Sequence, residues 1–269
     1  MRRAALDLLC CPQCGADLTF AKVDGQPDVV SGTLVCTRCS RRYAIRAGIA
    51  RFVSANDLYG TNRSVARFYD RFARFYALSS AMTFALLGGE RRARMEVLDR
   101  LELSGGRLLE VSIGPGVNLP HLFAMAQRLE VHGLDVSAGQ LQCCASLVAS
   151  RAWPVDLYHG LAEALPFRAD TFDGVLHVGG INLFTGMKQA IDEMIRVARP
   201  GARIVIADET ARLTRFFSRL LGTSPRRSAE ARATPADLLP YSMKRVQVRD
   251  IWKVHGKPHG YCLAFTKPG

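Results

Sequence analysis

The stretch that most constrains the fold is residues 107–119, RLLEVSIGPGVNL. A short apolar run precedes a turn that contains Ser112, Gly114 and Gly116, and a helix-compatible segment follows the turn. Glycines lack a Cβ atom, so their backbone can adopt positive φ and a ligand can approach it closely. The free N–H groups at the start of the helix then face polar groups of that ligand. This order of strand, glycine turn and helix is typical of a nucleotide-binding βα unit.

A second apolar strand, at residues 129–134, supports this interpretation. It ends at Asp135, which lies 19 residues after Gly116. An acidic side chain in this place can accept hydrogen bonds from both hydroxyls of a ribose. Glu110, at the end of the first strand, distinguishes the turn from the dehydrogenase GxGxxG motif. The sequence therefore predicts a nucleoside-containing cofactor between the glycine turn and Asp135.

Three further motifs follow in the chain: GLAEALPF at 160–167, FDGVLHVGGINLF at 172–184 and EMIRVARPGARIVIAD at 193–208. Together with the glycine turn and Asp135, they resemble the ordered motifs of class I S-adenosylmethionine-dependent methyltransferases. The resemblance covers residues 100–269 and is strongest to the branch that methylates quinones and small molecules on carbon or oxygen. It implies an α/β fold with a Rossmann-like, doubly wound, mostly parallel seven-stranded sheet whose last strand is antiparallel. It also implies S-adenosyl-L-methionine as the cofactor.

The resemblance assigns cofactor-binding positions along this segment. They are Glu110, Ser112, Gly114, Gly116, Asp135, Val136, Leu161, Ala162 and His177. Two positions depart from the family pattern. Ser112 stands where the family usually has its first glycine, and Leu161 stands where many members carry an Asp that binds the adenine amino group. We therefore expect backbone atoms of Ala162 to make the adenine contact.

The acceptor is expected near the end of the fourth core strand, because open α/β sheets bind ligands beyond the carboxyl ends of their strands. Methyl transfer from a sulfonium requires mainly orientation and a dry pocket, so a base is optional. His177 lies at this strand end and can accept a proton near neutral pH, which makes it a candidate catalytic residue. Packing inside the core is an equal alternative for this histidine. Asn182 is a second candidate, which either orients the acceptor or caps the helix that begins near Gly186.

Two CxxC knuckles near the start of the chain predict a metal site. Cys11 and Cys14 form the first knuckle, Cys36 and Cys39 form the second, and 21 residues separate the two. This spacing is close to the zinc-ribbon pattern, in which four thiolates bind Zn(II) tetrahedrally and stabilise a small fold. Cys10 could compete with Cys11, but only Cys11 gives the two-residue gap. A metal-free hairpin and a redox pair are the less favoured alternatives. The segment resembles the zinc-binding modules found on some methyltransferases and in a small methyltransferase-activating protein.

The pattern divides the chain into three parts. We predict a zinc-binding ribbon domain at 1–53, a linker and helical lid at 54–106 and a class I methyltransferase domain at 107–269, and we expect the first and third to have separate cores. Within 64–87, aromatic residues recur at helical spacing, which predicts a helix that resembles the YDxxAxxYD entry helix of the quinone-methylating branch. Tyr69 and Tyr76 are its candidate lid residues, although an aromatic stripe is more often core. Later segments predict an amphipathic helix at 210–221 and a polar segment at 223–240.

The net charge of the chain does not by itself decide which kind of partner the protein binds. A net charge of +12 favours nucleic acid or an anionic surface, yet residues 107–208 hold 8 Lys and Arg against 10 Asp and Glu, and residues 209–269 hold 12 against 4. The basic excess therefore lies outside the cofactor-binding segment. No apolar run reaches the roughly 18 residues of a membrane span, and the start lacks a secretion signal. We expect a cytoplasmic protein with reduced thiols, and the sequence gives no oligomeric state.

These observations favour methyl transfer to a small, largely apolar acceptor, such as a quinol, a phenol or a natural-product intermediate. The alternative is methylation of a ribosomal or transfer RNA base, with the zinc module as an RNA-recognition element. The basic balance fits RNA, but no Asn-Pro-Pro-Tyr-type motif follows the fourth core strand. A third hypothesis, without catalysis, has a vestigial cofactor site and a zinc module that recruits partners.

Overall fold

The computed structural model describes residues 1–24, 27–54, 56–86, 89–126, 128–210 and 234–269. The helix expected at 210–221 and most of the polar segment expected at 223–240 lie outside these ranges. Residues 235–238 of that polar segment form a single 3₁₀ turn.

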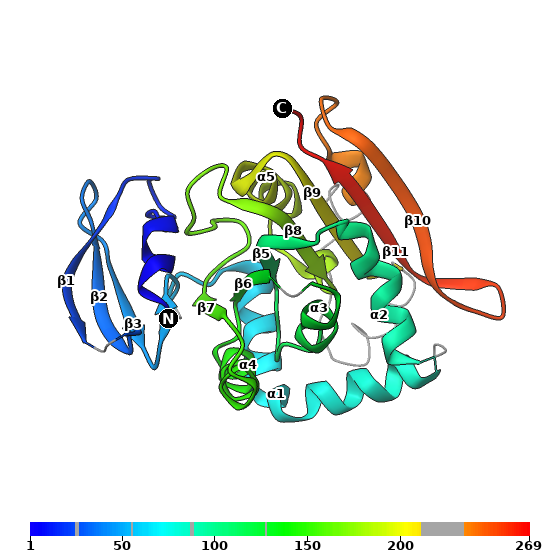
Figure 1. Cartoon of the computed structure of the whole chain (residues 1–269), viewed down its shortest axis with the longest axis horizontal. Coiled ribbons are helices and arrows are strands. Elements are labelled where there is room, and N and C mark those ends of the chain that lie inside the picture. Colours follow the sequence, from blue (N-terminus) through cyan, green and yellow to red (C-terminus); the bar gives the residue numbers. More distant parts are fainter. Residues whose placement is uncertain (25–26, 55, 87–88, 127, 211–233) are drawn as a thin grey trace.

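One continuous sheet of 11 strands runs through the described part of the chain, in the order β1-β2-β3-β4-β7-β6-β5-β8-β9-β11-β10 (Figure 1). The strands are β1 Leu18–Asp24, β2 Ser31–Cys36, β3 Arg42–Arg46, β4 Ile49–Arg51, β5 Gly105–Val111, β6 Arg128–Asp135, β7 Val155–His159, β8 Phe172–Val178, β9 Ala198–Glu209, β10 Lys244–Val254 and β11 Lys257–Thr266. From β7 to β9 all neighbours are parallel, and β11 lies antiparallel between β9 and β10. These seven strands form the doubly wound fold that the sequence predicts.

Five α-helices accompany the sheet: α1 Gly60–Leu86, α2 Glu90–Leu98, α3 Leu119–Met125, α4 Ala138–Arg151 and α5 Met187–Val197. Side chains of α2, α3 and α4 pack on one face of the sheet, and side chains of α5 pack on the other. Successive residues of β5, Leu108 and Leu109, are both fully buried and point to opposite faces, as expected for a strand inside a parallel sheet. Among the described helices, none has the length and apolarity that crossing a bilayer requires.

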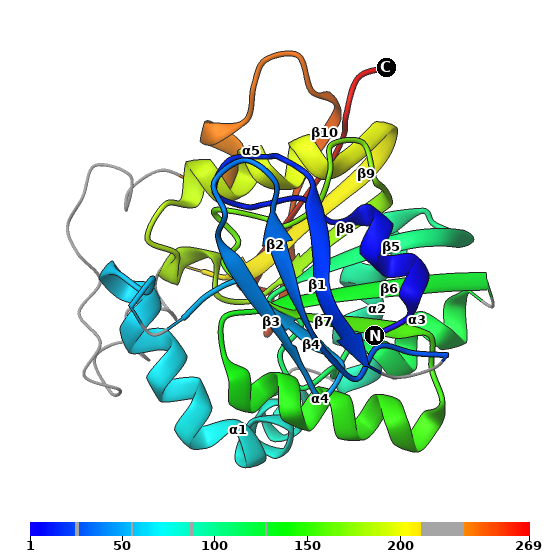
Figure 2. The same cartoon turned by 90° about the vertical axis from the view of Figure 1, so that its left-hand side faces the viewer.

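The sheet does not stop at β7, and here the predicted count of seven strands is wrong. β4 pairs in parallel with β7, with Ile49 opposite Leu157 and Arg51 opposite His159. Figure 2, which views the molecule from the side of the N-terminal strands, shows β4 beside β7. An edge strand exposes unpaired N–H and C=O groups, and β4 satisfies those of β7. The four N-terminal strands thus extend the core sheet.

The expectation of two separate cores is also wrong. Leu9 forms a bridge with Phe167, and both side chains belong to one continuous buried cluster that also includes Tyr43 and Phe52. At the outer edge, the guanidinium of Arg2 makes an ion pair of 2.7 Å with the carboxylate of Asp156, which is buried on β7. The N-terminal residues therefore fold against the core sheet as part of one hydrophobic unit.

Candidate functional site

A pocket lies at the carboxyl ends of the parallel strands, where open α/β sheets bind their ligands. Its walls come from the loops after β5, β6, β7 and β8, and from α1 and α4. The lining residues are Asn62, Val65, Tyr69, Tyr76, Ser112, Gly114, Leu134, Asp135, Val136, Gln140, Gly160, Leu161, Ala162, Glu163, Val178, Gly179, Gly180, Leu183 and Phe184.

The glycine turn after β5 has three residues in the left-handed region, Ser112 at φ 61°, Gly114 at 58° and Gly116 at 82°. A Cβ atom on Gly116 would lie 2.8 Å from Cδ1 of Leu119, so this glycine is required for packing. A Cβ atom on Gly114 would meet nothing within 4 Å, because this residue borders the open pocket. The left-handed conformation costs Ser112 about 1 to 2 kcal/mol.

The carboxylate of Asp135 holds this turn from the end of β6. Oδ2 accepts a hydrogen bond of 2.8 Å from the N–H of Gly114, and Oδ1 accepts one of 2.8 Å from the N–H of Ser137. Burial raises the pKa of Asp135 to about 6, and the backbone N–H groups of Ser137, Gly114 and Val136 partly oppose the shift. An ionised carboxylate can accept about four hydrogen bonds, so Asp135 keeps acceptor capacity for a ligand.

Asp70 connects α1 to the same region. Its Oδ1 accepts hydrogen bonds from the hydroxyl of Ser137, at 2.7 Å, and from the N–H of Gly139, at 2.8 Å. The Ser137 hydroxyl in turn accepts a bond from the N–H of Gln140 and so caps α4. Our sequence analysis missed Asp70, although it follows Tyr69 in the YDxxA pattern that suggested the entry helix.

A second buried contact fixes the start of α1 against the loop after β8. Oε1 of Glu163 accepts hydrogen bonds from Nδ2 of Asn62, at 2.9 Å, and from the N–H of Thr185, at 3.1 Å. Both side chains are nearly fully buried and line the pocket. The sequence offers no local signal for this pair, because 101 residues separate its members.

Aromatic side chains of α1 form the wall opposite the sheet. The rings of Tyr69 and Tyr76 meet edge to face, with centroids 5.6 Å apart. Burial raises the pKa of both phenols, that of Tyr76 to about 12, so both are neutral at physiological pH. This side of the pocket therefore suits a flat, apolar group.

Asp208, near the end of β9, fixes the loop after β8 by hydrogen bonds. The Asp208 carboxylate accepts hydrogen bonds from the N–H groups of Gly180, at 3.0 Å, and Asn182, at 3.1 Å. The Asn182 side chain donates to the backbone oxygen of Glu209 and does not line the pocket. It does not cap α5 either, whose N-cap is Gly186. Asn182 therefore positions the loop.

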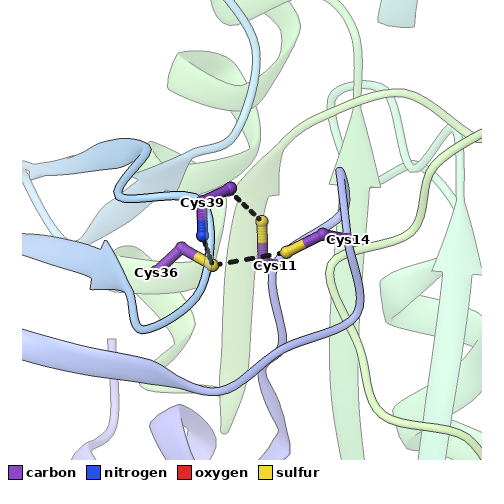
Figure 3. Close-up of side chains that lie close together, drawn as sticks. All are labelled: Cys11, Cys14, Cys36 and Cys39. Carbon is purple, nitrogen blue, oxygen red and sulfur yellow. Dashed lines mark hydrogen bonds between the residues drawn. The ribbon is translucent and has the colours of Figure 1, made fainter.

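The four knuckle cysteines form a separate cluster in the N-terminal strands (Figure 3). Their sulfur atoms all lie within 4.8 Å of one another, with Cys11 and Cys39 at 3.7 Å and Cys14 and Cys36 at 3.4 Å. In a tetrahedral site with Zn–S bonds of about 2.3 Å, the sulfurs are about 3.8 Å apart. Backbone N–H groups of the second knuckle point at Sγ of Cys36, which lowers the pKa of that thiol. The cluster fits a metal that prefers four thiolates, and Cys10 lies outside it.

Two segments of the chain match models of known protein families. Residues 109–206 match the model of a methyltransferase domain, and residues 2–48 match the model of Trm112p-like proteins. The order of core strands and the position of the pocket agree with the first match. The core of this chain is a class I S-adenosylmethionine-dependent methyltransferase domain. A Trm112p-like zinc-ribbon module precedes it.

Curated relatives match the methyltransferase domain over part of their length. The chain is 32% identical over 157 residues to the ubiquinone/menaquinone biosynthesis C-methyltransferase of Geobacter sulfurreducens, covering 57% of this chain and 60% of that protein. It is 34% identical over 147 residues to the demethylmenaquinone methyltransferase of Renibacterium salmoninarum, covering 54% of this chain and 58% of that protein. The match thus spans about 60% of these relatives.

Solved structures share the fold of the methyltransferase domain at low identity. The geranyl diphosphate C-methyltransferase of Streptomyces coelicolor superposes with a TM-score of 0.61 at 12% identity, covering 78% of this chain and 98% of that one. A chain from the complex between the Haloferax volcanii Trm112 methyltransferase activator and a methyltransferase superposes with a TM-score of 0.59 at 15% identity, covering 75% and 98%.

The methyltransferase domain brings most of the expected cofactor residues to one pocket. Those that line it are Ser112, Gly114, Asp135, Val136, Leu161 and Ala162. Gly116 lies behind the turn, against α4. His177 is fully buried and does not line the pocket: its Nδ1 contacts the backbone oxygen of Val111 at 3.0 Å, and its ring packs on Phe184. Burial lowers the pKa of His177 to about 4, so these surroundings fit a packing histidine better than a base.

Glu110 does not line the pocket and lies beneath the glycine turn. Its Oε1 accepts a hydrogen bond of 2.6 Å from Nδ2 of Asn118, and Oδ1 of Asn118 accepts one of 2.7 Å from Nη1 of Arg94. Oε2 of Glu110 has no hydrogen-bond partner in the described part of the chain. Burial raises the pKa of this carboxyl to about 7, although the Asn118 bond and Arg94 lower it. Glu110 thus supports the turn at an electrostatic cost.

We predict that Glu110→Gln stabilises the methyltransferase domain above neutral pH. The folded-state pKa of about 7 exceeds the ordinary value of 4.5, so folding favours the protonated form and stability falls as pH rises between these values. Gln keeps the acceptor for Asn118 without the charge. Urea unfolding should give a gain on the order of 2 kcal/mol at pH 8 and little difference at pH 4. A variant less stable than the parent at pH 8 would contradict this electrostatic account.

Proposed function

We propose that the chain transfers a methyl group from S-adenosyl-L-methionine to a small, largely apolar acceptor. The observation that carries the proposal is the buried carboxylate of Asp135, which borders the pocket beside the glycine turn. Its free acceptor positions fit the two hydroxyls of a ribose. The open space at Gly114 allows the rest of the cofactor to lie along the turn.

The residues after β6 and β7 would hold the adenine. Val136, Leu161 and Ala162 form an apolar wall beside Asp135. Leu161 provides no polar side chain for the adenine amino group, so backbone atoms of Ala162 would have to make this contact. The bound cofactor supplies the activated methyl group, and the protein orients the acceptor and excludes water. We assign no base, because His177 lies outside the pocket.

The acceptor class follows from the opposite wall. Tyr69 and Tyr76 of α1, together with Phe184 from the loop after β8, give this side of the pocket an aromatic surface, which favours a flat and largely uncharged group. The relatives named above, which by name act in ubiquinone and menaquinone biosynthesis, support the same class. Because the chain carries a Trm112p-like module, RNA remains the alternative methyl acceptor. The arginines that would form an RNA footprint, Arg212, Arg215, Arg219, Arg226 and Arg227, lie outside the described residues.

Asp135→Asn tests the cofactor site. We expect calorimetry to show S-adenosyl-L-methionine binding that is weakened about 10- to 100-fold, because two hydroxyls lose a charged acceptor. In the parent, the affinity should also fall about tenfold between pH 7 and pH 5, because the carboxylate with its pKa of about 6 must be ionised to accept both bonds. The variant should lose most of this pH dependence.

Asp192→Asn is the matched control, because Asp192 is an exposed carboxylate on α5 that pairs with Lys188 on the same helix. It should bind the cofactor as the parent does. Equal affinity in Asp135→Asn and the parent would remove this carboxylate from the site.

We further propose that the four-cysteine cluster binds one Zn(II) ion per chain in a structural role. Four thiolates without a position for substrate are typical of closed structural sites. The hydroxyl of Tyr43 lies 3.1 Å from Sγ of Cys11, which fits an outer-shell contact that orients this ligand. Because β4 continues the sheet into β7, we expect the metal to stabilise the methyltransferase domain as well.

Cys36→Ser tests both parts of this proposal. We expect the variant to lose the zinc and to unfold about 5 °C or more below the parent. Tryptophan fluorescence should report this shift, since Trp153 and Trp252 both belong to the methyltransferase domain. Cys143→Ser, on α4, is the control and should keep the metal. Purified protein without zinc, prepared without chelators, or an unshifted tryptophan signal in Cys36→Ser, would contradict the proposal.

A further inference from the structure

The pocket uses only one face of α1. Asn62, Val65, Tyr69 and Tyr76 point into the pocket from this face. With 3.6 residues per turn, the rest of the helix surface divides into two further stripes. Figures 1 and 2 show α1 at the periphery of the described part of the chain, beside α4.

The first stripe is basic. Arg63, Arg67, Arg71 and Arg74 recur at steps of four, four and three residues, and all four are exposed. Arg63 donates to the backbone oxygen of Leu58. Across the described ranges of the chain, no carboxylate lies within ion-pair distance of the other three. Four arginines on one side of one helix thus give this side a net positive charge, although the exposed Asp70 lies beside Arg67 and Arg74.

The second stripe is apolar and lies between the arginines and the pocket-lining face. Phe72 is 43% exposed, Phe75 is 66% exposed and Met82 is 64% exposed. Phe68 is half-buried and contacts Phe72, with ring centroids 4.8 Å apart. Large side chains exposed in a row on one helix are unusual unless a partner covers them. Phe72, Phe75 and Met82 thus lie at the surface, whereas Tyr69 and Tyr76 on the same helix are half-buried.

We propose that α1 docks onto an anionic lipid bilayer through these two stripes. A helix that lies in a membrane interface buries aromatic and aliphatic side chains among the acyl chains and places Arg and Lys against the headgroups. The arginine stripe is complementary to anionic headgroups, and the convex helix surface suits a flat bilayer better than a single-stranded RNA, which requires a groove.

The position of the stripes also indicates which class of acceptor the pocket takes. The apolar stripe adjoins the face that carries Tyr69 and Tyr76, so a docked α1 brings the aromatic wall of the pocket close to the membrane. A lipid-soluble acceptor could then enter from the bilayer without crossing water. This part of the inference rests on the proposed function, whereas the docking surface does not.

Co-sedimentation with lipid vesicles tests the surface. The full chain should bind vesicles of phosphatidylglycerol and phosphatidylcholine at 0.15 M salt at least about tenfold better than vesicles of phosphatidylcholine alone. The double variant Arg67→Glu, Arg71→Glu should lower binding to the anionic vesicles by about tenfold or more. Phe75→Ser should lower it by a similar factor, because the ring no longer enters the acyl region.

Matched variants elsewhere on the surface serve as controls. Arg42→Glu with Arg249→Glu reverses two exposed arginines on β3 and β10, and Val248→Ser removes an exposed apolar side chain from β10. These variants should bind anionic vesicles as the parent does. Calorimetric binding of S-adenosyl-L-methionine should be unchanged in every variant, which reports that each one is folded.

Three results would overturn the docking proposal. The first is equal vesicle binding by the parent, the α1 variants and the controls, or no binding by any of them. The second is RNA binding that the arginine variant loses while vesicle binding is absent. The third is a dimer that Phe75→Ser separates, again without vesicle binding. Vesicle binding that depends on α1 in a protein that fails to bind the cofactor would support the surface and refute the proposed function.

Discussion

The hydrogen bonds of the Asp135 carboxylate hold the whole candidate site together. One oxygen fixes the glycine turn through Gly114, and the other fixes the start of α4 through Ser137. The hydroxyl of Ser137 donates a hydrogen bond to Asp70 and so links this site to α1, which lines the pocket. Turn, helix and lid thus meet at one carboxylate, at the point where β6 ends. A ligand that binds Asp135 contacts all three elements indirectly, which suits a cofactor that must be positioned before its acceptor.

This arrangement buries carboxyl groups that water would solvate better than the protein interior does. Burial raises the pKa of Asp135 to about 6 and that of Glu110 to about 7, so at neutral pH both carboxyls lower the stability of the folded state. The surrounding core offsets the cost. Leu108, Leu109 and Val111 of β5 are fully buried, and the N-terminal module extends their sheet by four strands. Strain at a binding site that a large core supports is common in proteins that bind ligands.

The sequence predicted those features that depend on neighbours in the chain. The strand, the glycine turn and Asp135 lie close together in sequence, and each CxxC knuckle is four residues long. The pairing of β4 with β7 escaped prediction, because β4 has only three residues and its partner lies about a hundred positions later. The contact between Asn62 and Glu163 was missed for the same reason. His177 lies near the end of β8, as the strand pattern predicts, but the direction of its ring depends on packing against Phe184, which lies outside that strand.

The module and the methyltransferase domain share a sheet and a core, so the four-cysteine cluster, the pocket and α1 are parts of one folded unit. The central claim about this unit is that the nucleoside of the cofactor lies against Asp135. A crystal structure of the chain with S-adenosylhomocysteine tests this claim most directly. We expect both ribose hydroxyls within about 3.2 Å of the Asp135 carboxylate and the adenine beside Leu161 and Ala162. A nucleoside bound elsewhere, or a pocket that stays without it at saturating concentration, would contradict the account.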